Sequence, residues 1–151
     1  MENKPICEID TLGNKMWYLN GKLHREDGPA VELVNGTKKW YLNGKLHHLD
    51  GPAIEFYHGG KQWYINGKLH RLDGPAVEYT DGSKRWYIDG KLHRLDGPAI
   101  IWDDDNKEWW VNDIEITDEI IQWAEENDID LDNLTGVDKD LIKIVWADYG
   151  K

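Results

Sequence analysis

The sequence predicts a mainly β protein, an antiparallel β-meander of hairpin repeats with a 23-residue period that ends in a two-helix C-terminal cap. Three observations lead to this fold class. The tetrapeptide Asp-Gly-Pro-Ala recurs at a constant spacing, turn-forming dipeptides recur at two positions of the same period, and after residue 116 the repeat gives way to apolar residues at helical spacing. The four tetrapeptides begin at Asp27, Asp50, Asp73 and Asp96.

The array is expected to begin inside a repeat. Gly13 stands one period before Gly36, and Ile6 to Thr11 is predicted to form the first strand. Cys7 occupies the position that Ala30 holds in the next copy, which predicts a small buried side chain there and not a nucleophile.

Each full repeat contains two turns and a corner. The first turn is Asn-Gly, or Asp-Gly in the fourth copy, which is the preferred two-residue type I′ loop of β-hairpins. It occupies residues 20–21, 43–44, 66–67 and 89–90. A second turn, at 35–36, 58–59 and 81–82, is predicted to be a similar tight loop. Between the two, the proline of Asp-Gly-Pro lacks the N–H group of a sheet ladder and should break or open a strand.

Two-residue loops fix which residues lie opposite each other. The loop at 66–67 pairs Tyr64 with Leu69, and the same loop at 81–82 would pair Val77 with Trp86. One sheet face would then carry Trp63, Ile65, His70, Val77, Tyr79, Trp86, Ile88 and His93, and the other Tyr64, Leu69, Ala76, Glu78, Arg85, Tyr87 and Leu92. Stacked repeats are expected to place in one row the residues Trp17, Trp40, Trp63, Trp86 and Trp109.

A fifth hairpin begins at residues 109–113 and then the pattern changes. Thr117 is predicted to be the N-cap of a helix that runs to about Asn127, with acidic residues in its first turn. Val137 to about Ala147 is predicted to form a second helix. The chain is therefore divided into a β-hairpin array of about four and a half repeats (1–116) and an acidic helical cap over its open end (117–151).

The net charge of −11 is concentrated in the last third of the chain. Residues 1–102 contain 14 Lys and Arg against 13 Asp and Glu, whereas residues 103–151 contain 4 against 16, which gives +1 and −12. The acidic segment is either a solvated helical face or a surface for a basic partner. With one cysteine, no apolar leader and no apolar run of membrane-spanning length, the chain is expected to be cytoplasmic, without a membrane contact; its oligomeric state is left open.

The repeat histidines and aspartates invite a catalytic or metal-binding interpretation. They form four His-x-x-Asp sets, with His24, His47, His70 and His93 preceding Asp27, Asp50, Asp73 and Asp96. Stacking spreads them along an axis, so we expect a structural role: each Asp caps its own corner through backbone N–H groups, and each His packs by its Trp and bonds that corner. No catalytic residue, metal or cofactor is predicted. His48, where the other corners have Arg, is interpreted as surface variation.

Two further sequence patterns resemble binding sites. Columns of lysine, such as Lys22 and Lys45, beside aromatic rows suggest a nucleic-acid platform, but acidic residues offset them, and nucleic acid is not an expected partner. The run Asp128-x-Asp130-x-Asp132 has calcium-loop spacing, yet it lacks the glycine and the bidentate glutamate of an EF-hand.

The 23-residue unit, Tyr-x-Asn-Gly-Lys-x-His followed by a glycine corner, a short strand and Asp-Gly-x-Lys, resembles the MORN repeat. Its Trp-Tyr and His-Arg-x-Asp-Gly-Pro-Ala motifs, as in residues 70–76, are more similar to MORN-like repeat proteins of large bacteriophages and giant viruses. The resemblance covers about residues 6–150 and implies a viral, non-enzymatic hairpin-repeat protein that acts inside an infected cell.

From this resemblance and the charge asymmetry we expect the protein to bind a host protein, with inhibition of a host defence system as the working hypothesis. The expected partner-binding residues are Trp63, Tyr64, Trp86, Tyr87, Arg71, Arg94, Trp109 and Trp110. Two alternatives stay open: sequestration of a nucleotide or signalling small molecule by an aromatic and lysine-lined pocket, and mimicry of nucleic acid by the acidic tail.

Overall fold

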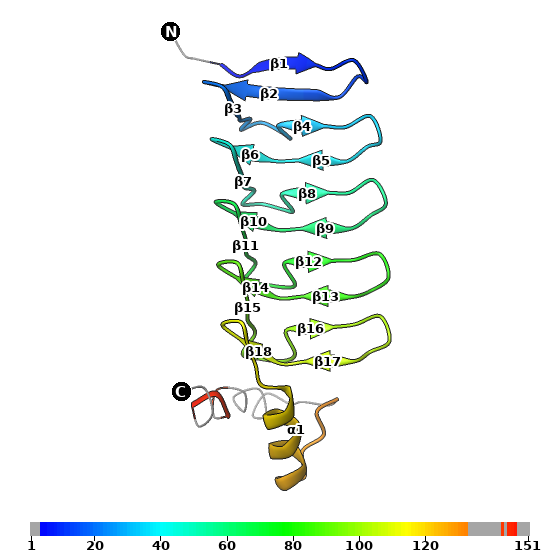
Figure 1. Cartoon of the computed structure of the whole chain (residues 1–151), viewed down its shortest axis with the longest axis vertical. Helices are drawn as coiled ribbons and strands as arrows, with labels where there is room; N and C mark the ends of the chain where they lie inside the picture. The colour runs from blue at the N-terminus through cyan, green and yellow to red at the C-terminus, as the bar shows by residue number, and fades with distance from the viewer. Residues whose placement is uncertain (1–3, 133–142, 144, 148–151) are drawn as a thin grey trace.

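The computed structural model describes residues 4–132, 143 and 145–147, and shows a mainly β array of antiparallel hairpins, which confirms the predicted fold class (Figure 1). One eleven-stranded sheet runs the length of the array in the order β1-β2-β4-β5-β8-β9-β12-β13-β16-β17, with β3 paired to β2. Its strands are β1 (Ile6–Ile9), β2 (Lys15–Leu19), β3 (Lys22–Leu23), β4 (Val31–Glu32), β5 (Lys38–Lys39), β8 (Ile54–Glu55), β9 (Lys61–Gln62), β12 (Val77–Glu78), β13 (Lys84–Arg85), β16 (Ile100–Ile101) and β17 (Lys107–Glu108).

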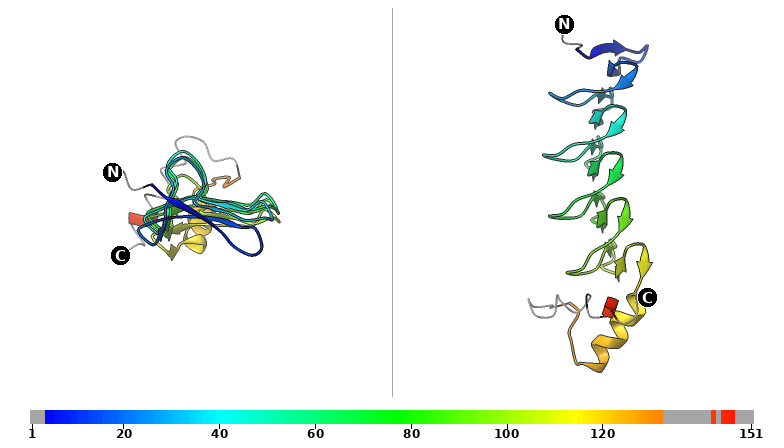
Figure 2. Two further views of the ribbon diagram at one scale, coloured as in Figure 1. Left: turned by 90° about the horizontal axis from the view of Figure 1, so that it is seen from above. Right: turned by 90° about the vertical axis from the view of Figure 1, so that its left-hand side faces the viewer.

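Four separate two-stranded hairpins lie beside this sheet, one for each later repeat. They pair β6 (Tyr41–Leu42) with β7 (Lys45–Leu46), β10 (Tyr64–Ile65) with β11 (Lys68–Leu69), β14 (Tyr87–Ile88) with β15 (Lys91–Leu92), and β18 (Trp110–Val111) with β19 (Ile114–Glu115). Viewed along the stack, corresponding segments of successive repeats superimpose (Figure 2, left).

The Asn-Gly hairpins have the predicted register. Tyr64 lies opposite Leu69, and both loop residues have positive φ, 51° at Asn66 and 83° at Gly67, as a type I′ turn requires. The loops also link neighbouring repeats, because the Gly90 N–H donates to the Leu69 carbonyl of the preceding hairpin (2.8 Å).

The second turn is one residue longer than predicted, so the predicted pairing of Val77 with Trp86 is wrong. Val77 lies opposite Arg85 and Glu78 opposite Lys84. The Tyr79 N–H donates to the Ser83 carbonyl (3.0 Å), which closes a three-residue loop with its glycine at positive φ. The assignment of Val77 and Trp86 to one face, with Arg85 on the other, is therefore wrong as well.

This register sorts charge and burial onto the two faces of the long sheet. The alanine of each corner is fully buried, and the aliphatic residue that follows it is buried to within 3–7% exposure. The opposite face carries alternating acidic and basic residues on neighbouring strands, namely Lys15, Glu32, Lys38, Glu55, Lys61, Glu78 and Lys84. Opposite charges on adjacent strands stabilise the pairing.

Cys7 is exposed, which corrects the prediction that it fills an alanine site. Its strand, β1, pairs only with β2 at the end of the sheet. The corner alanines are covered by repeats on both sides, and Cys7 has a repeat on one side only.

The helix α1 (Thr117–Glu126) follows the last hairpin, with Asp118 and Glu119 in its first turn as predicted. Its N-cap is Ile116, so the predicted Thr117 cap is wrong. Thr117 Oγ1 instead accepts a hydrogen bond from the Trp109 N–H (3.1 Å) and ties the helix to the last repeat.

Most of the second predicted helix, 137–147, lies outside the described residues; residues 145–147 are helical. The main core cluster joins Trp109, Val111, Ile116, Ile120 and Val145. The described part of the chain forms no helix long and apolar enough to cross a membrane.

Candidate functional site: grooves between the corners

The corner segments project from one side of the array as regularly spaced loops (Figure 2, right). In the third corner the Arg71 guanidinium holds the loop together: Nε donates to Asp73 Oδ1 (3.0 Å), and Nη1 donates to the Pro75 carbonyl (3.2 Å) and to Glu78 Oε1 (3.0 Å). The hydrogen bond from Arg71 Nε lowers the pKa of Asp73. The prediction that the aspartate caps the corner through backbone N–H groups is corrected, since its main partner is the arginine.

The same guanidinium lies 4.0 Å above the ring of Trp63. Arg25 over Trp17 and Arg94 over Trp86 repeat this cation–π contact at 4.1 and 4.2 Å. Arg71 and Arg94 were expected to meet a partner, and the structure shows both already engaged in contacts within the chain.

The second corner uses His48 in place of the arginine. Its ring stacks on Trp40, with centroids 4.9 Å apart and planes within 5°. Its Nδ1 lies 2.9 Å from the Pro52 carbonyl oxygen and donates a hydrogen bond to it, because that oxygen can only accept. His48 thus supports the corner and is not mere surface variation. Among the described residues Asp50 has no cationic partner, unlike its counterparts in the other three corners.

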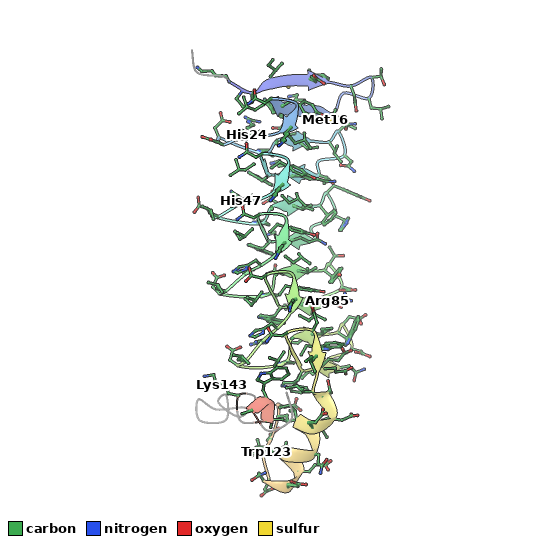
Figure 3. All side chains as sticks on the ribbon, turned by 60° about the vertical axis from the view of Figure 1, so that its left-hand side comes forward. Met16, His24, His47, Arg85, Trp123 and Lys143 are labelled. Atoms are coloured by element: carbon green, nitrogen blue, oxygen red, sulfur yellow. The ribbon has the colours of Figure 1, made fainter. Side chains whose placement is uncertain are left out.

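The repeat histidines join neighbouring repeats, which corrects the prediction that each bonds its own corner. Nδ1 of His24 accepts a hydrogen bond from the Asn43 N–H of the next Asn-Gly loop (3.1 Å), and His47 and His70 make the same contact. His24 and His47 lie one above the other on successive repeats (Figure 3). Within the described residues no group of three or more His, Cys, Asp or Glu side chains could hold a metal ion.

Grooves open between the second and third corners and between the third and fourth corners. The groove at Trp63 has a volume of about 670 Å³ and is bounded by the second corner, including Leu49, and the third corner, including Leu72. We call it the Trp63 groove. Leu49 is 75% exposed and Leu72 is 82% exposed. The next groove, at Trp86 and Ile88, measures about 830 Å³ and is also bordered by Lys143.

The grooves bring together only part of the predicted binding set. Trp63, Arg71, Trp86 and Arg94 line them. Tyr64, like its counterparts Tyr41 and Tyr87, is half-buried and lines neither of these two grooves, and burial raises its pKa.

The end of the array departs further from the prediction. Trp109 lies in the core, and the Trp110 indole donates to Glu108 (2.8 Å). Sequence reasoning missed the two corner leucines. The signal in the sequence was a leucine between polar residues in a turn. The equivalent residues of the other two corners are Glu26 and Leu95.

Comparison with models of known protein families gives no match, and comparison with curated proteins gives none either.

Proposed function

We propose that this chain is a non-enzymatic binding protein that holds a partner protein against its row of corner grooves. The observation that carries the proposal is the pair of exposed leucines, Leu49 and Leu72, on the two sides of the Trp63 groove. An apolar groove with exposed apolar rims is the kind of surface that protein partners cover.

The frame around this groove is held in place before any partner arrives. Arg71 fixes the third corner through four contacts, and His48 fixes the second through two. A rigid groove loses little conformational entropy on binding, which favours affinity.

The resemblance to repeat proteins of bacteriophages suggests the setting of this interaction. We propose that the partner is a protein of an infected bacterial cell and that binding inhibits a defence protein of that host. The net charge of −11 favours a partner with a basic surface.

The small-molecule alternative is less well supported by the grooves. A nucleotide would need free cations for its phosphates, and Arg71 and Arg94 are already paired with Asp73 and Asp96. Nucleic-acid mimicry by the acidic tail would leave the corner leucines without a role.

The test is capture from a bacterial lysate by the immobilised full-length chain. Three forms are compared: the unmodified chain, the double variant Leu49→Ser/Leu72→Ser, and the control Leu12→Ser, which changes a leucine of similar exposure (74%) in a different turn. We expect a protein that the unmodified chain and the control retain and the double variant loses. Equal retention by all three, or no retained protein, contradicts the proposal.

A further inference from the structure

We infer that the Trp63 groove receives an aliphatic side chain from a helical segment of the partner protein, with a basic side chain nearby in that segment. This inference rests on the proposed function and specifies the element of the partner that binds.

At the end of the array the chain itself covers the position that is equivalent to this groove, with α1 in place of a further corner. Trp109 and Val111 stand one period after Trp86 and Ile88, and two periods after Trp63 and Ile65. Trp109 is 3% exposed and Val111 is 1% exposed, because they form one core cluster with Ile116 and Ile120 at α1 and with Val145 from the helical residues 145–147. Residues 145–147 and α1 lie at this end of the array in Figure 1.

Leu95, the corner leucine beside this covered position, is partly buried. Leu95 stands one period after Leu72 and packs against the cluster that contains Val145. Leu72 and Leu49 occupy the same corner position and remain exposed. Leu49 stands before Trp63 as Leu95 stands before Trp109, so an aliphatic residue placed in the Trp63 groove would make, with Leu49, the kind of contact that Leu95 already makes at the end of the array.

A helix suits this site better than an extended peptide. A strand would have to add to a sheet edge. Ile65 of β10 lines the groove, but β10 is paired with β11, and the Tyr64 carbonyl already accepts a hydrogen bond from the His48 N–H of the preceding corner (3.1 Å). The corners project beside the groove, and one residue that covers the equivalent position at the end of the array, Val145, comes from helical residues.

The rim of the groove indicates the charge of the partner segment. His48 makes no ion pair with Asp50, so that carboxylate borders the groove without a cationic partner among the described residues. In the chain's own segment, Lys143 borders the adjacent Trp86 groove two positions before Val145 (Figure 3). A lysine or arginine close to the inserted aliphatic residue would offer Asp50 a cationic partner.

The probe is a synthetic peptide with the sequence of residues 137–151, added at millimolar concentration to the isotope-labelled full-length chain. The control peptide carries Val145→Asp. Proton–nitrogen NMR spectra follow the indole N–H signals of Trp63, Trp86 and Trp109. We expect the first peptide to shift the Trp63 signal in a saturable way, and the control peptide to bind at least ~10-fold more weakly.

The protein variants supply the second comparison. Leu49→Ser/Leu72→Ser should weaken peptide binding at least ~10-fold, and Leu12→Ser should leave it unchanged. Absence of a Trp63 shift, a shift confined to Trp109, or equal binding of the two peptides would overturn the inference. If lysate capture still depends on the corner leucines when the peptide fails, the proposed function stands and the helical ligand is wrong; if capture is independent of them, the proposed function fails.

Discussion

Arg71 should contribute more to the stability of the array than any ordinary surface arginine. Replacing it by alanine removes the stack on Trp63, the hydrogen bond to the Pro75 carbonyl and the pairs with Asp73 and Glu78. Arg71→His is the matched control, because the second repeat shows that histidine keeps the stack and the proline carbonyl bond.

The magnitude follows from these contacts. A hydrogen bond from a charged donor contributes about 1.5–3 kcal/mol, and a partly buried cation–π contact about 0.5–2 kcal/mol. The pairs with exposed carboxylates add little. We therefore expect Arg71→Ala to lower the free energy of unfolding by about 3 kcal/mol. Arg71→His should lower it by about 1 kcal/mol, because histidine loses mainly the ion pairs of the guanidinium and its closer fit over the Trp63 ring.

Urea unfolding followed by tryptophan fluorescence measures both changes. The reverse substitution, His48→Arg, should raise stability by roughly 0.5–1 kcal/mol, because it offers Asp50 the cation that the other corners have. If Arg71→Ala costs less than about 1 kcal/mol, or if histidine costs as much as alanine, the corner is not held by this side chain in the way that the contacts indicate.

Two further predictions concern the same corner. A Cβ atom on Gly74 would lie 2.9 Å from Arg71 Cζ. Gly74→Ala should therefore destabilise the unmodified chain clearly and the Arg71→Ala chain only slightly. Additive losses of unfolding free energy in a double-mutant cycle would contradict this. Hydrogen bonds from Arg25 and Arg71 lower the pKa of Asp27 and of Asp73 below the ordinary value of 3.8. The stability that these two carboxylates contribute is therefore fully present above that ordinary value, and it is lost as the pH falls from there through the folded-state pKa. Unfolding free energies measured from about pH 5 downward should fall less steeply in Arg71→His, and identical slopes would count against the pairing.

The sequence predicted those parts of the fold that depend on local backbone chemistry. Asn66-Gly67 needs positive φ at both positions, so hairpin and register followed directly. Asp81-Gly82 is compatible with either a two-residue or a three-residue loop, and the choice is made by the pairing of Val77 with Arg85 on one side and with Gln62 of the preceding strand on the other. That pairing is a property of stacked repeats and not of the dipeptide.

The grooves were only half predictable for a related reason. The period placed a tryptophan in every copy and an arginine in three of the four corners, but whether a repeated arginine is free or engaged depends on how the corner folds back over the tryptophan. Helical spacing predicted α1, whereas its N-cap depended on Ile116 occupying the histidine position of the aborted repeat, where its N–H donates to the Trp109 carbonyl (2.8 Å).

One position of the corner separates the grooves from one another. Residues 26, 49, 72 and 95 are equivalent, and they are Glu, Leu, Leu and Leu. The first corner therefore presents a carboxylate, and Leu95 is already packed against the C-terminal core. The Trp63 groove alone has an uncovered leucine on each side. The surrounding frame is otherwise repeated, with His48 replacing the arginine of the second corner, so this substitution pattern gives a periodic surface a single preferred site, and the periodic residues determine only its shape.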